Sequence, residues 1–365
     1  MVSLLKVNRW VFSASALALT VSLGACAPSS NNQAGAGNAG GGGGTTITLN
    51  GAGATAPNPV YQRWFADYNK ENPNVQISYQ SVGSGAGVKQ FLAETIDFGA
   101  TDAPLKDDER SKYPTGRGAT PIQIPTTGLF IVFAYNLDGV EDLKLSREVY
   151  CGIVDGSIKN WNDPAIAAEN KDAKLPDLPI AYAYRSDGSG TTSIFTSHLD
   201  EACPNWKGGS GKSVEWPTGT GAKGNEGVTA QINQTKGAIG YVEYSYAKEN
   251  GLKMATLENK AGEYIKPTPE AAGKALEGVE PDSKFVVTVE DPAGKDAYPI
   301  VSLTYLLLYS EYADAAKGEA MKNLVTWMMK SGGTAAGELG YIPLPASMQD
   351  KVIAQVGNIK VASAK

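Results

Sequence analysis

Histidine is almost absent from this 365-residue sequence, which contains only His198. Cysteine is nearly as rare, with three residues in the chain. Because transition-metal sites are built from clusters of histidine and cysteine, we expect no metal. We expect no cofactor either. The shortage of histidine also disfavours a hydrolase, since a serine nucleophile needs a base beside it. We therefore predict that the chain is not an enzyme.

Basic residues do not outnumber acidic ones in this chain. The chain has 32 Lys and Arg against 38 Asp and Glu, a formal net charge of −6. Nucleic acids and anionic membranes select basic surfaces, so we expect no nucleic-acid partner. Any anion that the chain binds must be held by helix ends and one or two cations, because no broad positive field is available.

A hydrophobic run long enough to cross a membrane is not seen at the N-terminus. Residues 10–21 form an apolar stretch of twelve residues after two basic ones, and a spanning helix needs about 20. Leu-Gly-Ala-Cys (23–26) then matches the cleavage pattern of bacterial lipoproteins. We predict a lipoprotein signal peptide over residues 1–25, lipid attachment at Cys26, and an extracytoplasmic protein anchored to the cell membrane. The alternative is an ordinary secretory peptide followed by an incidental cysteine.

Residues 26–45 lack the apolar side chains that a core requires. They consist mainly of Ser, Asn, Gln, Ala and Gly and include five consecutive glycines. Such a composition predicts a flexible tether between the anchor and the folded part.

The two remaining cysteines are Cys151 and Cys203. An even pair in an oxidising compartment predicts a disulfide. Two separate buried thiols stay open as the alternative, because the sequence does not give the distance between them.

The first part of the folded chain alternates between strand and helix patterns. Residues 45–49, 75–80 and 96–100 predict strands, and amphipathic helices are predicted between them. This alternation indicates an α/β protein with a mostly parallel sheet, whose ligand sites lie at the carboxyl ends of the strands. The long apolar run over 122–136 is expected to cross into a second domain, and the loop over 291–299 to lead back. The glycine-rich stretch 208–224 is expected to be a long loop, followed by a short helix over 228–234.

Three glycine-rich turns each connect a predicted strand to a predicted helix. They cover residues 50–57, 81–87 and 185–191. Each turn carries a hydroxyl, from Thr55, Ser84 and Ser189 respectively. A helix start offers unpaired N–H groups and a partial positive charge. Three such starts predict one anion surrounded by helix N-termini.

The third turn also contains a cation. Arg185 supplies a forked, permanently charged donor that suits a tetrahedral oxyanion. Asp187, two residues later, could hold the guanidinium in place. The alternative is an ordinary Gly/Ser turn that caps a helix.

Five segments in fixed order now carry a specific resemblance. They are Gly-Ala-Gly-Ala-Thr (51–55), Gly-Ser-Gly-Ala-Gly-Val-Lys-Gln (83–90), Asp-Phe-Gly-Ala-Thr-Asp-Ala-Pro-Leu (97–105), Arg-Ser-Asp-Gly-Ser-Gly-Thr (185–191) and Gly-Ala-Ile-Gly-Tyr-Val-Glu-Tyr (237–244). Over nearly all of residues 46–360 the chain resembles the periplasmic phosphate-binding protein of the bacterial phosphate-specific ABC transporter.

The resemblance implies a two-lobed type II periplasmic binding protein fold with the ligand cleft between the lobes. Lobe I would comprise residues 46–123 and 298–365, and lobe II residues 124–297. It implies a monomer that binds inorganic phosphate and delivers it to ABC permease subunits in the inner membrane. Closure of the two lobes about their two crossings is the expected motion.

The resemblance also implies the phosphate contacts. They are Thr55, Ala56, Ser84, Asp102, Arg185, Ser189, Gly190 and Thr191, with Asp187 steadying the arginine. One position departs from the family, where residue 56 is often phenylalanine. Alanine keeps the backbone N–H there but removes aromatic cover over the ligand.

Asp102 is the residue expected to set specificity. An ionised carboxylate only accepts hydrogen bonds, so it suits an oxyanion that still carries a proton, as hydrogen phosphate does near neutral pH. Sulfate or molybdate, the alternative ligands of the same fold, would be repelled. On the residues alone, Asp102 could instead cap a helix that begins at the following Ala103-Pro104.

A secreted phosphatase or serine hydrolase is the alternative from a different functional class. Asp187 stands where a nucleophile elbow needs glycine, two residues before Ser189. His198 lies two turns or more further along the predicted helix and is expected to point away. Neither residue therefore favours the alternative.

Overall fold

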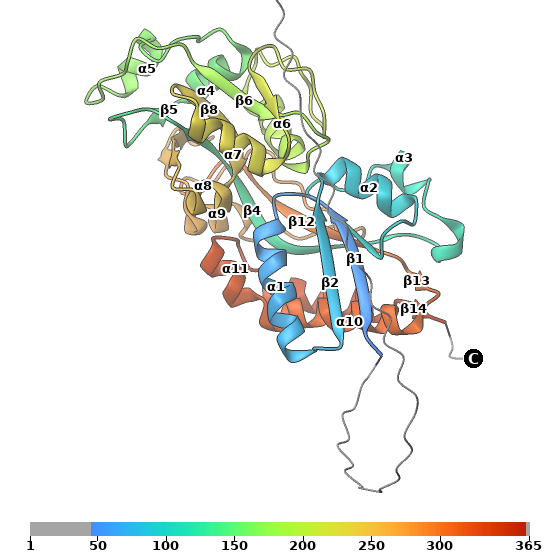
Figure 1. Cartoon of the computed structure of the whole chain (residues 1–365). Coiled ribbons are helices and arrows are strands. Elements are labelled where there is room, and N and C mark those ends of the chain that lie inside the picture. The colour runs from blue at the N-terminus through green and yellow to red at the C-terminus, as the bar shows by residue number, and fades with distance from the viewer. Residues whose placement is uncertain (1–44, 363–365) are drawn as a thin grey trace, which may run out of the picture. The chain divides into compact units, whose positions relative to one another are not determined.

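The structure is a computed structural model and describes residues 45–362 (Figure 1). The predicted signal peptide (1–25), Cys26 and all of the tether except Thr45 lie outside the described residues. The described residues belong to one compact unit. None of its helices combines the length and the apolar character needed to span a membrane.

The structure contains fourteen strands and twelve α-helices in the described residues. The strands are β1 (Ile47–Gly53), β2 (Val75–Ser81), β3 (Phe98–Thr101), β4 (Ile122–Tyr135), β5 (Lys144–Leu145), β6 (Ala181–Arg185), β7 (Thr220–Ala222), β8 (Ala238–Glu243), β9 (Lys253–Met254), β10 (Thr256–Glu258), β11 (Tyr264–Ile265), β12 (Val301–Leu308), β13 (Glu311–Tyr312) and β14 (Lys360–Val361). The helices are α1 (Asn58–Glu71), α2 (Ser84–Leu92), α3 (Asp107–Arg110), α4 (Arg147–Asp155), α5 (Pro164–Glu169), α6 (Gly190–Ala202), α7 (Gly224–Gln234), α8 (Tyr244–Glu249), α9 (Pro269–Leu276), α10 (Ala315–Ser331), α11 (Gly333–Leu339) and α12 (Ala346–Gly357).

One long strand organises the main sheet, whose order is β2-β1-β3-β12-β4-β8-β6-β7. The first part of β4 pairs with β12, and its last part, from Ile131 to Tyr135, pairs with β8. All fourteen residues of β4 are buried. The predicted crossover at 122–136 is therefore a single core strand, and the predicted lobe boundary at residue 124 falls inside it. The division into lobes stays a prediction.

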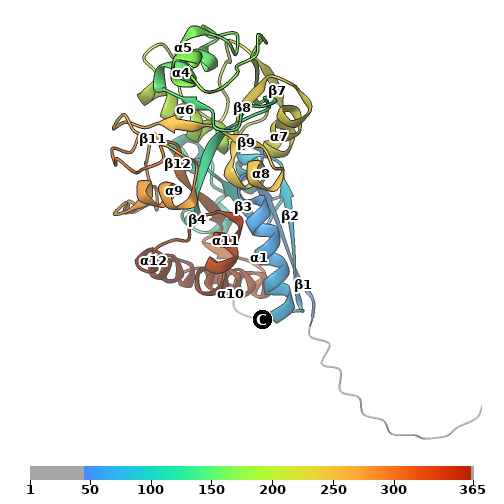
Figure 2. The same ribbon diagram turned by 90° about the vertical axis from the view of Figure 1, so that its left-hand side faces the viewer.

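Helices cover both parts of this sheet. Helix α1 packs against β2, α10 against β1, and α2 against β1 and β3. Helices α6 and α7 pack against β8 in the other part of the sheet (Figures 1 and 2). The central strands β12 and β4 pair antiparallel with each other and with their neighbours β3 and β8, so the sheet is mixed and the prediction of a mostly parallel sheet was wrong. Strands β1, β2 and β3 are parallel, as are β6, β7 and β8. Helices α1, α2 and α6 therefore begin after the carboxyl ends of parallel strands, where ligands of α/β proteins bind.

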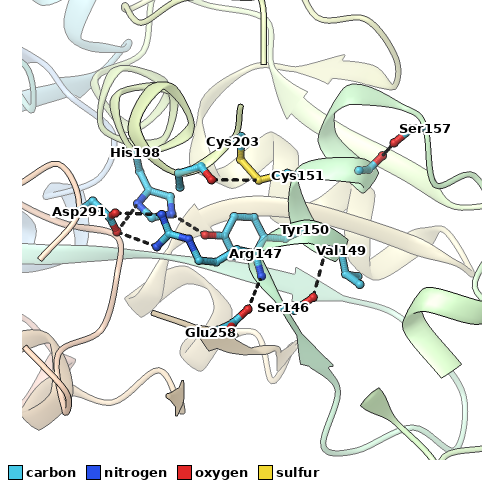
Figure 3. The surroundings of a disulfide bond; sticks show 12 residues. Ser146, Arg147, Val149, Tyr150, Cys151, Ser157, His198, Cys203, Glu258 and Asp291 are labelled. Atoms are coloured by element: carbon cyan, nitrogen blue, oxygen red, sulfur yellow. Dashed lines mark hydrogen bonds and ion pairs between the residues drawn. A yellow bond between two sulfur atoms is a disulfide. The ribbon is translucent and has the colours of Figure 1, made fainter. Parts of the chain in front are cut away.

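Cys151 and Cys203 are joined by a disulfide, with their Cα atoms 5.5 Å apart. Cys151 lies in α4, and Cys203 is the residue that follows the last turn of α6. The bond thus connects two helices at the end of α6 that is remote from Gly190 (Figure 3).

Two expectations from the sequence were wrong in detail. Residues 50–53 belong to β1 and not to a turn, because their glycines serve strand packing. A Cβ on Gly51 would collide with the ring of Phe98, and one on Gly53 with the carbonyl of Ala100. The stretch 208–224, expected to be a loop, contains β7 and leads directly into α7, which begins four residues earlier than expected.

Candidate functional site

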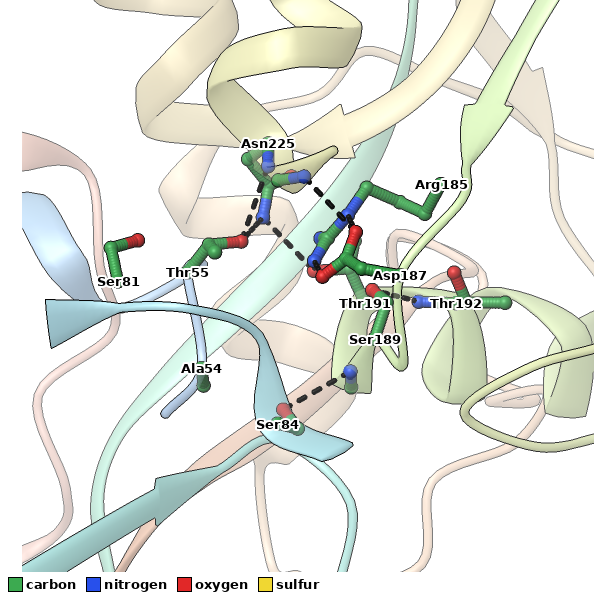
Figure 4. A network of polar contacts seen from close by, with 12 residues as sticks. Ala54, Thr55, Ser81, Ser84, Arg185, Asp187, Ser189, Thr191, Thr192 and Asn225 are labelled. Atoms are coloured by element: carbon green, nitrogen blue, oxygen red, sulfur yellow. Dashed lines mark hydrogen bonds and ion pairs between the residues drawn. The ribbon is translucent and has the colours of Figure 1, made fainter. Parts of the chain in front are cut away.

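Four helix N-termini meet at one place, one more than the sequence predicted. They belong to α1, α2, α6 and α7 (Figure 4). Gly85, in the first turn of α2, donates from its backbone N–H to the carbonyl oxygen of Gly188 at 2.8 Å, just before α6. The Cα atom of Gly188 lies 3.1 Å from the position that a Cβ on Gly85 would take, so side chains there would keep the segments apart.

Two threonine hydroxyls at this place are saturated as acceptors. Thr55 Oγ1 accepts from the backbone N–H of Asn225 at 3.2 Å and from its side-chain Nδ2 at 2.7 Å. Thr191 Oγ1 accepts from Arg185 Nη1 at 3.3 Å and from Asn225 Nδ2 at 3.1 Å. A hydroxyl has two lone pairs and one hydrogen, so each threonine keeps its O–H to donate elsewhere.

Ser84 has the same arrangement. Its Oγ accepts from the backbone N–H of Asp102 at 3.2 Å and from that of Gly190 at 3.1 Å. The second bond joins the start of α2 to the start of α6 (Figure 4). Ser84 is buried, so its remaining hydrogen also needs an acceptor inside the protein or in a ligand.

The N-terminus of α6 has fewer unpaired hydrogen-bond donors than the sequence suggested. Ser189 caps the helix by accepting from the N–H of Thr192 at 3.0 Å. Its own N–H donates to the carbonyl of Lys212 at 2.7 Å, and the N–H of Gly190 is bonded to Ser84. Ser189 therefore has its hydroxyl hydrogen left to give.

The start of α1 also presents backbone donors that have no partner in the described residues. The N–H groups of Thr55 and Ala56 have no hydrogen-bond partner within residues 45–362. Both residues are almost fully buried. Buried N–H groups are rarely left without an acceptor, so this pair indicates an anion site.

Arg185 and Asp187 form a bidentate pair beside these helix starts. Nε donates to Oδ1 at 2.8 Å and Nη2 to Oδ2 at 2.7 Å, and the arginine side chain is 1% exposed. Burial raises the pKa of Asp187, but the hydrogen bonds and charge of Arg185 outweigh it and keep that pKa below its ordinary value. The N–H of Gly224 at the start of α7 also donates to Asp187, at 3.0 Å. Asp187 thus holds the guanidinium of Arg185 in place, and the N-terminus of α7 in turn holds Asp187.

Asp102 follows β3 and is 1% exposed. Its Oδ1 accepts from Thr304 Oγ1 at 2.8 Å, and its Oδ2 has no partner in the described part of the chain. Burial raises the pKa of Asp102 to about 6, although the Thr304 hydrogen bond and the charge of Arg185 act in the other direction. The next helix, α3, begins only at Asp107, after Lys106. The helix-cap alternative for Asp102 is therefore wrong.

A second buried carboxyl group, Glu243, lies close enough to Asp102 for their charges to interact. Its Oε2 accepts from the N–H and the hydroxyl of Ser245. Burial raises the pKa of Glu243 to about 8. Tyr341 links this group to the site, since its hydroxyl contacts Ser245 at 2.9 Å and donates to the carbonyl of Ala56 at 2.7 Å.

Sequence reasoning missed Asn225, Thr304 and the functional surroundings of Glu243. A signal for Asn225 was present, because Lys-Gly-Asn (223–225) precedes the helical spacing of Val228 and Ile232 and could have marked a helix start. Thr304 had no local signal, since it lies 202 residues from Asp102 in the chain.

His198 takes no part in this site. It is buried, and its Nε2 lies 3.0 Å from the hydroxyl of Tyr150 (Figure 3). Its Nδ1 lies 3.1 Å from the carbonyl of Glu290. Burial lowers the pKa of His198 to about 4. Within residues 45–362, no group of three or more His, Cys, Asp and Glu side chains could hold a metal ion. The site therefore combines hydrogen-bond donors, one cation and one carboxylate acceptor.

Comparisons with known proteins agree on one family. A family model described as the PBP superfamily domain matches residues 34–331. "Phosphate-binding protein PstS" of Pasteurella multocida (strain Pm70) is 41% identical over 311 residues, which cover 84% of this chain and 88% of that protein. A protein of the same name from Methanocaldococcus jannaschii is 37% identical over 335 residues, covering 84% and 85%.

Solved structures give the same fold. A high affinity periplasmic phosphate-binding protein (PfluDING) bound with phosphate has a TM-score of 0.73 at 22% identity, covering 84% of this chain and 93% of that one. The phosphate-binding protein from Stenotrophomonas maltophilia has a TM-score of 0.67 at 21% identity, covering 85% and 94%. The predicted α/β type II periplasmic binding protein fold is thus confirmed.

Proposed function

This chain belongs to the PstS family of phosphate-binding proteins, and we propose on that premise that it captures inorganic phosphate outside the cytoplasm and delivers it to the permease of an ABC transporter. It acts as a substrate-binding protein and carries out no reaction. The periplasmic phosphate-binding protein of similar fold, with phosphate bound, supports this assignment.

The main support for the proposal is the arrangement of hydrogen-bond donors and acceptors at the N-termini of the four helices. The hydroxyls of Thr55, Ser84 and Thr191 each accept two N–H bonds and are left as donors. Asp102 Oδ2 and Glu243 Oε1 are left as carboxyl oxygens without a partner in the described residues. Burial raises the pKa of Glu243 to about 8, which leaves Asp102 as the ionised acceptor near neutral pH. Hydrogen phosphate offers the matching set, with three oxygens that accept and one O–H that donates.

The proposed phosphate ligands are those implied by the sequence. They are Thr55, Ala56, Ser84, Asp102, Arg185, Ser189, Gly190 and Thr191, with Asp187 holding the arginine. In this proposal Gly190 already donates its N–H to Ser84, so its main contribution is the close approach that a missing Cβ permits. Ala56 contributes its N–H and no aromatic cover.

The N-terminal features complete the proposal. Cys26 would carry the lipid, residues 26–45 would act as the tether, and the protein would work as a monomer at the outer face of the membrane. The lipoprotein cleavage pattern and the glycine-rich composition of this segment support these points. Mass spectrometry of the mature N-terminus would test them, and an unmodified residue in place of a lipidated Cys26 would contradict the anchor.

Calorimetry with the purified chain tests the function. We expect phosphate to bind with a dissociation constant of about 1 μM or tighter, equivalent to about −8 kcal/mol. Sulfate and molybdate in large excess should not compete, because they have no proton to give to Asp102. Equal competition by sulfate would remove the specificity argument. Hydrolysis of a chromogenic phosphate ester that is lost in Ser189→Ala would instead favour the hydrolase alternative.

A further inference from the structure

Asn225 is a fully buried side chain at the centre of the polar network and is not among the proposed phosphate ligands. It lies in the first turn of α7. Its amide contacts Thr55, which is 170 residues away in the chain, and Thr191, which is 34 residues away. One side chain therefore connects the start of α1 with the start of α6 (Figure 4).

The orientation of the Asn225 amide is fixed by the main chain. Its Oδ1 accepts from the backbone N–H of Glu243 at 2.9 Å. A backbone N–H can only donate, so the oxygen must face Glu243 and the NH₂ group must face the two threonines. The NH₂ group has two hydrogens, and it makes one bond to each threonine hydroxyl.

This geometry determines what the threonines can do. If either hydroxyl turned its hydrogen toward Asn225, two donors would oppose each other in a buried space, which is costly. Each hydroxyl hydrogen is therefore directed away from Asn225. Arg185 Nη1 and the backbone N–H of Asn225 occupy the remaining lone pairs, so the hydrogens are directed away from those groups as well.

We propose that Asn225 is a positioning residue that sets the donor direction of the Thr55 and Thr191 hydroxyls before phosphate arrives. The inference rests on the proposed function and adds a specificity determinant to it. Asn225 does not touch the anion. It commits two hydroxyls to donate, so that an oxyanion is accepted and a ligand that donates at those positions is refused.

The substitution Asn225→Asp tests this inference with almost no change in shape. One carboxylate oxygen would still accept from Glu243, but the other would draw the threonine hydrogens toward itself and would add a negative charge near the ligand. We expect phosphate affinity to fall about 100-fold or more, measured by calorimetry on the full chain. Asn225→Ala leaves the Thr55 and Thr191 hydroxyls free to rotate but does not draw their hydrogens away from the ligand. This variant should lose about tenfold in phosphate affinity.

An uncharged variant separates positioning from a structural role. If Asn225 only filled space, the similarly sized substitution Asn225→Leu would leave phosphate affinity within about threefold of the parent, and that result would overturn the inference. Phosphate affinity of Asn225→Asp within about threefold of the parent would also overturn it. Circular dichroism and thermal unfolding establish that each variant is folded.

Asn136 provides a matched control at the opposite end of the same helix. Its Nδ2 donates to the carbonyls of Ile232 and Asn233 near the end of α7. Asn136→Asp should destabilise α7 by placing a carboxylate beside those carbonyls, yet leave phosphate affinity unchanged. Equal loss of affinity in Asn136→Asp and Asn225→Asp would mean that disturbing α7 is enough, and the inference would fail.

A double-mutant cycle covers the case in which Asn225→Asp does not fold. Because Asn225 acts through Thr191, Asn225→Ala should cost less affinity when Thr191 is already valine. Additive losses would overturn the inference. If the parent chain bound no phosphate, both the proposed function and this inference would fail. If the parent bound phosphate and the Asn225 variants bound it equally well, only the inference would fail.

Discussion

Thr304 Oγ1 donates a 2.8 Å hydrogen bond to Oδ1 of Asp102, from a strand 202 residues further along the chain. This bond occupies one oxygen of the Asp102 carboxylate and leaves the other, Oδ2, buried and without a partner in the described residues. The bond holds the carboxylate in one orientation, so a single acceptor is presented. The specificity that we propose depends on this acceptor and on its charge.

Replacing Asp102 with asparagine should weaken the discrimination between phosphate and sulfate. The neutral amide does not repel sulfate and can donate to it, so we expect sulfate to compete with phosphate at neutral pH in this variant. In the parent, sulfate should begin to compete only as the pH falls below about 6, where Asp102 becomes protonated. Competition calorimetry at several pH values measures both effects. Sulfate binding that is equally absent from the parent and the variant at every pH would contradict the role of Asp102.

Replacing Arg185 with methionine should remove the one cation of the site. We expect phosphate affinity to fall about 100-fold or more, and the fold to lose stability because Asp187 keeps a partly buried charge without its partner. The double variant Arg185→Met, Asp187→Asn should regain stability but not affinity. Thermal unfolding and calorimetry distinguish the two. Recovery of tight binding in the double variant would show that the guanidinium is not a phosphate ligand.

Replacing Gly190 with alanine should disturb the contact between α2 and α6. A Cβ there would lie 2.5 Å from Ser84 Oγ and 2.6 Å from Asp102 Oδ2. We expect at least about a tenfold loss of phosphate affinity, because these atoms must move apart. Gly273→Ala is the control, since a Cβ at that position meets no atom within 4 Å. Unchanged affinity in Gly190→Ala would mean that the close contact is not needed for binding.

Replacing Glu243 with glutamine should change how stability depends on pH. Burial raises the pKa of Glu243 from its ordinary value of 4.5 to about 8 in the folded state. The folded state therefore binds the proton more tightly, and the associated stability is present below pH 4.5 and is lost as the pH rises toward about 8. The melting temperature of Glu243→Gln relative to the parent should increase over the same range. A constant difference between the two proteins would contradict an ionising Glu243.

Removing the disulfide should lower stability without affecting binding. The double variant Cys151→Ser, Cys203→Ser removes the covalent bond between α4 and the end of α6, whose cysteines are 52 residues apart in the chain. We expect a loss of about 2–4 kcal/mol in the free energy of unfolding, measured with denaturant. Phosphate affinity should stay within about threefold, because the disulfide lies at the end of α6 opposite Ser189 and Gly190. A large loss of affinity would indicate that the far end of α6 controls its N-terminus.

Much of the fold was predictable because its signals are local. The alternation of strand and helix patterns and the long apolar run at 122–136 predicted strands β1 to β4 of the main sheet. Predictions failed where glycine had two explanations. At Gly51 and Gly53 the missing side chain allows close strand packing, which no neighbouring residue in the sequence reveals. Gly224 is the first residue of α7, although the glycine-rich stretch around it resembles a loop.

The sequence by itself determined the helix starts with their hydroxyls and the Arg185–Asp187 spacing, since caps and pairs two residues apart depend on adjacent residues. Tertiary structure alone decided that Thr304 would bond Asp102, that Asn225 would bridge Thr55 and Thr191, and that Glu243 would lie near Asp102. These partners are distant in the chain, and a polar side chain shows no local trace of the group it will meet. Burial also decided the shifted pKa values of both carboxyl groups, because the cost of losing water depends on everything packed around them.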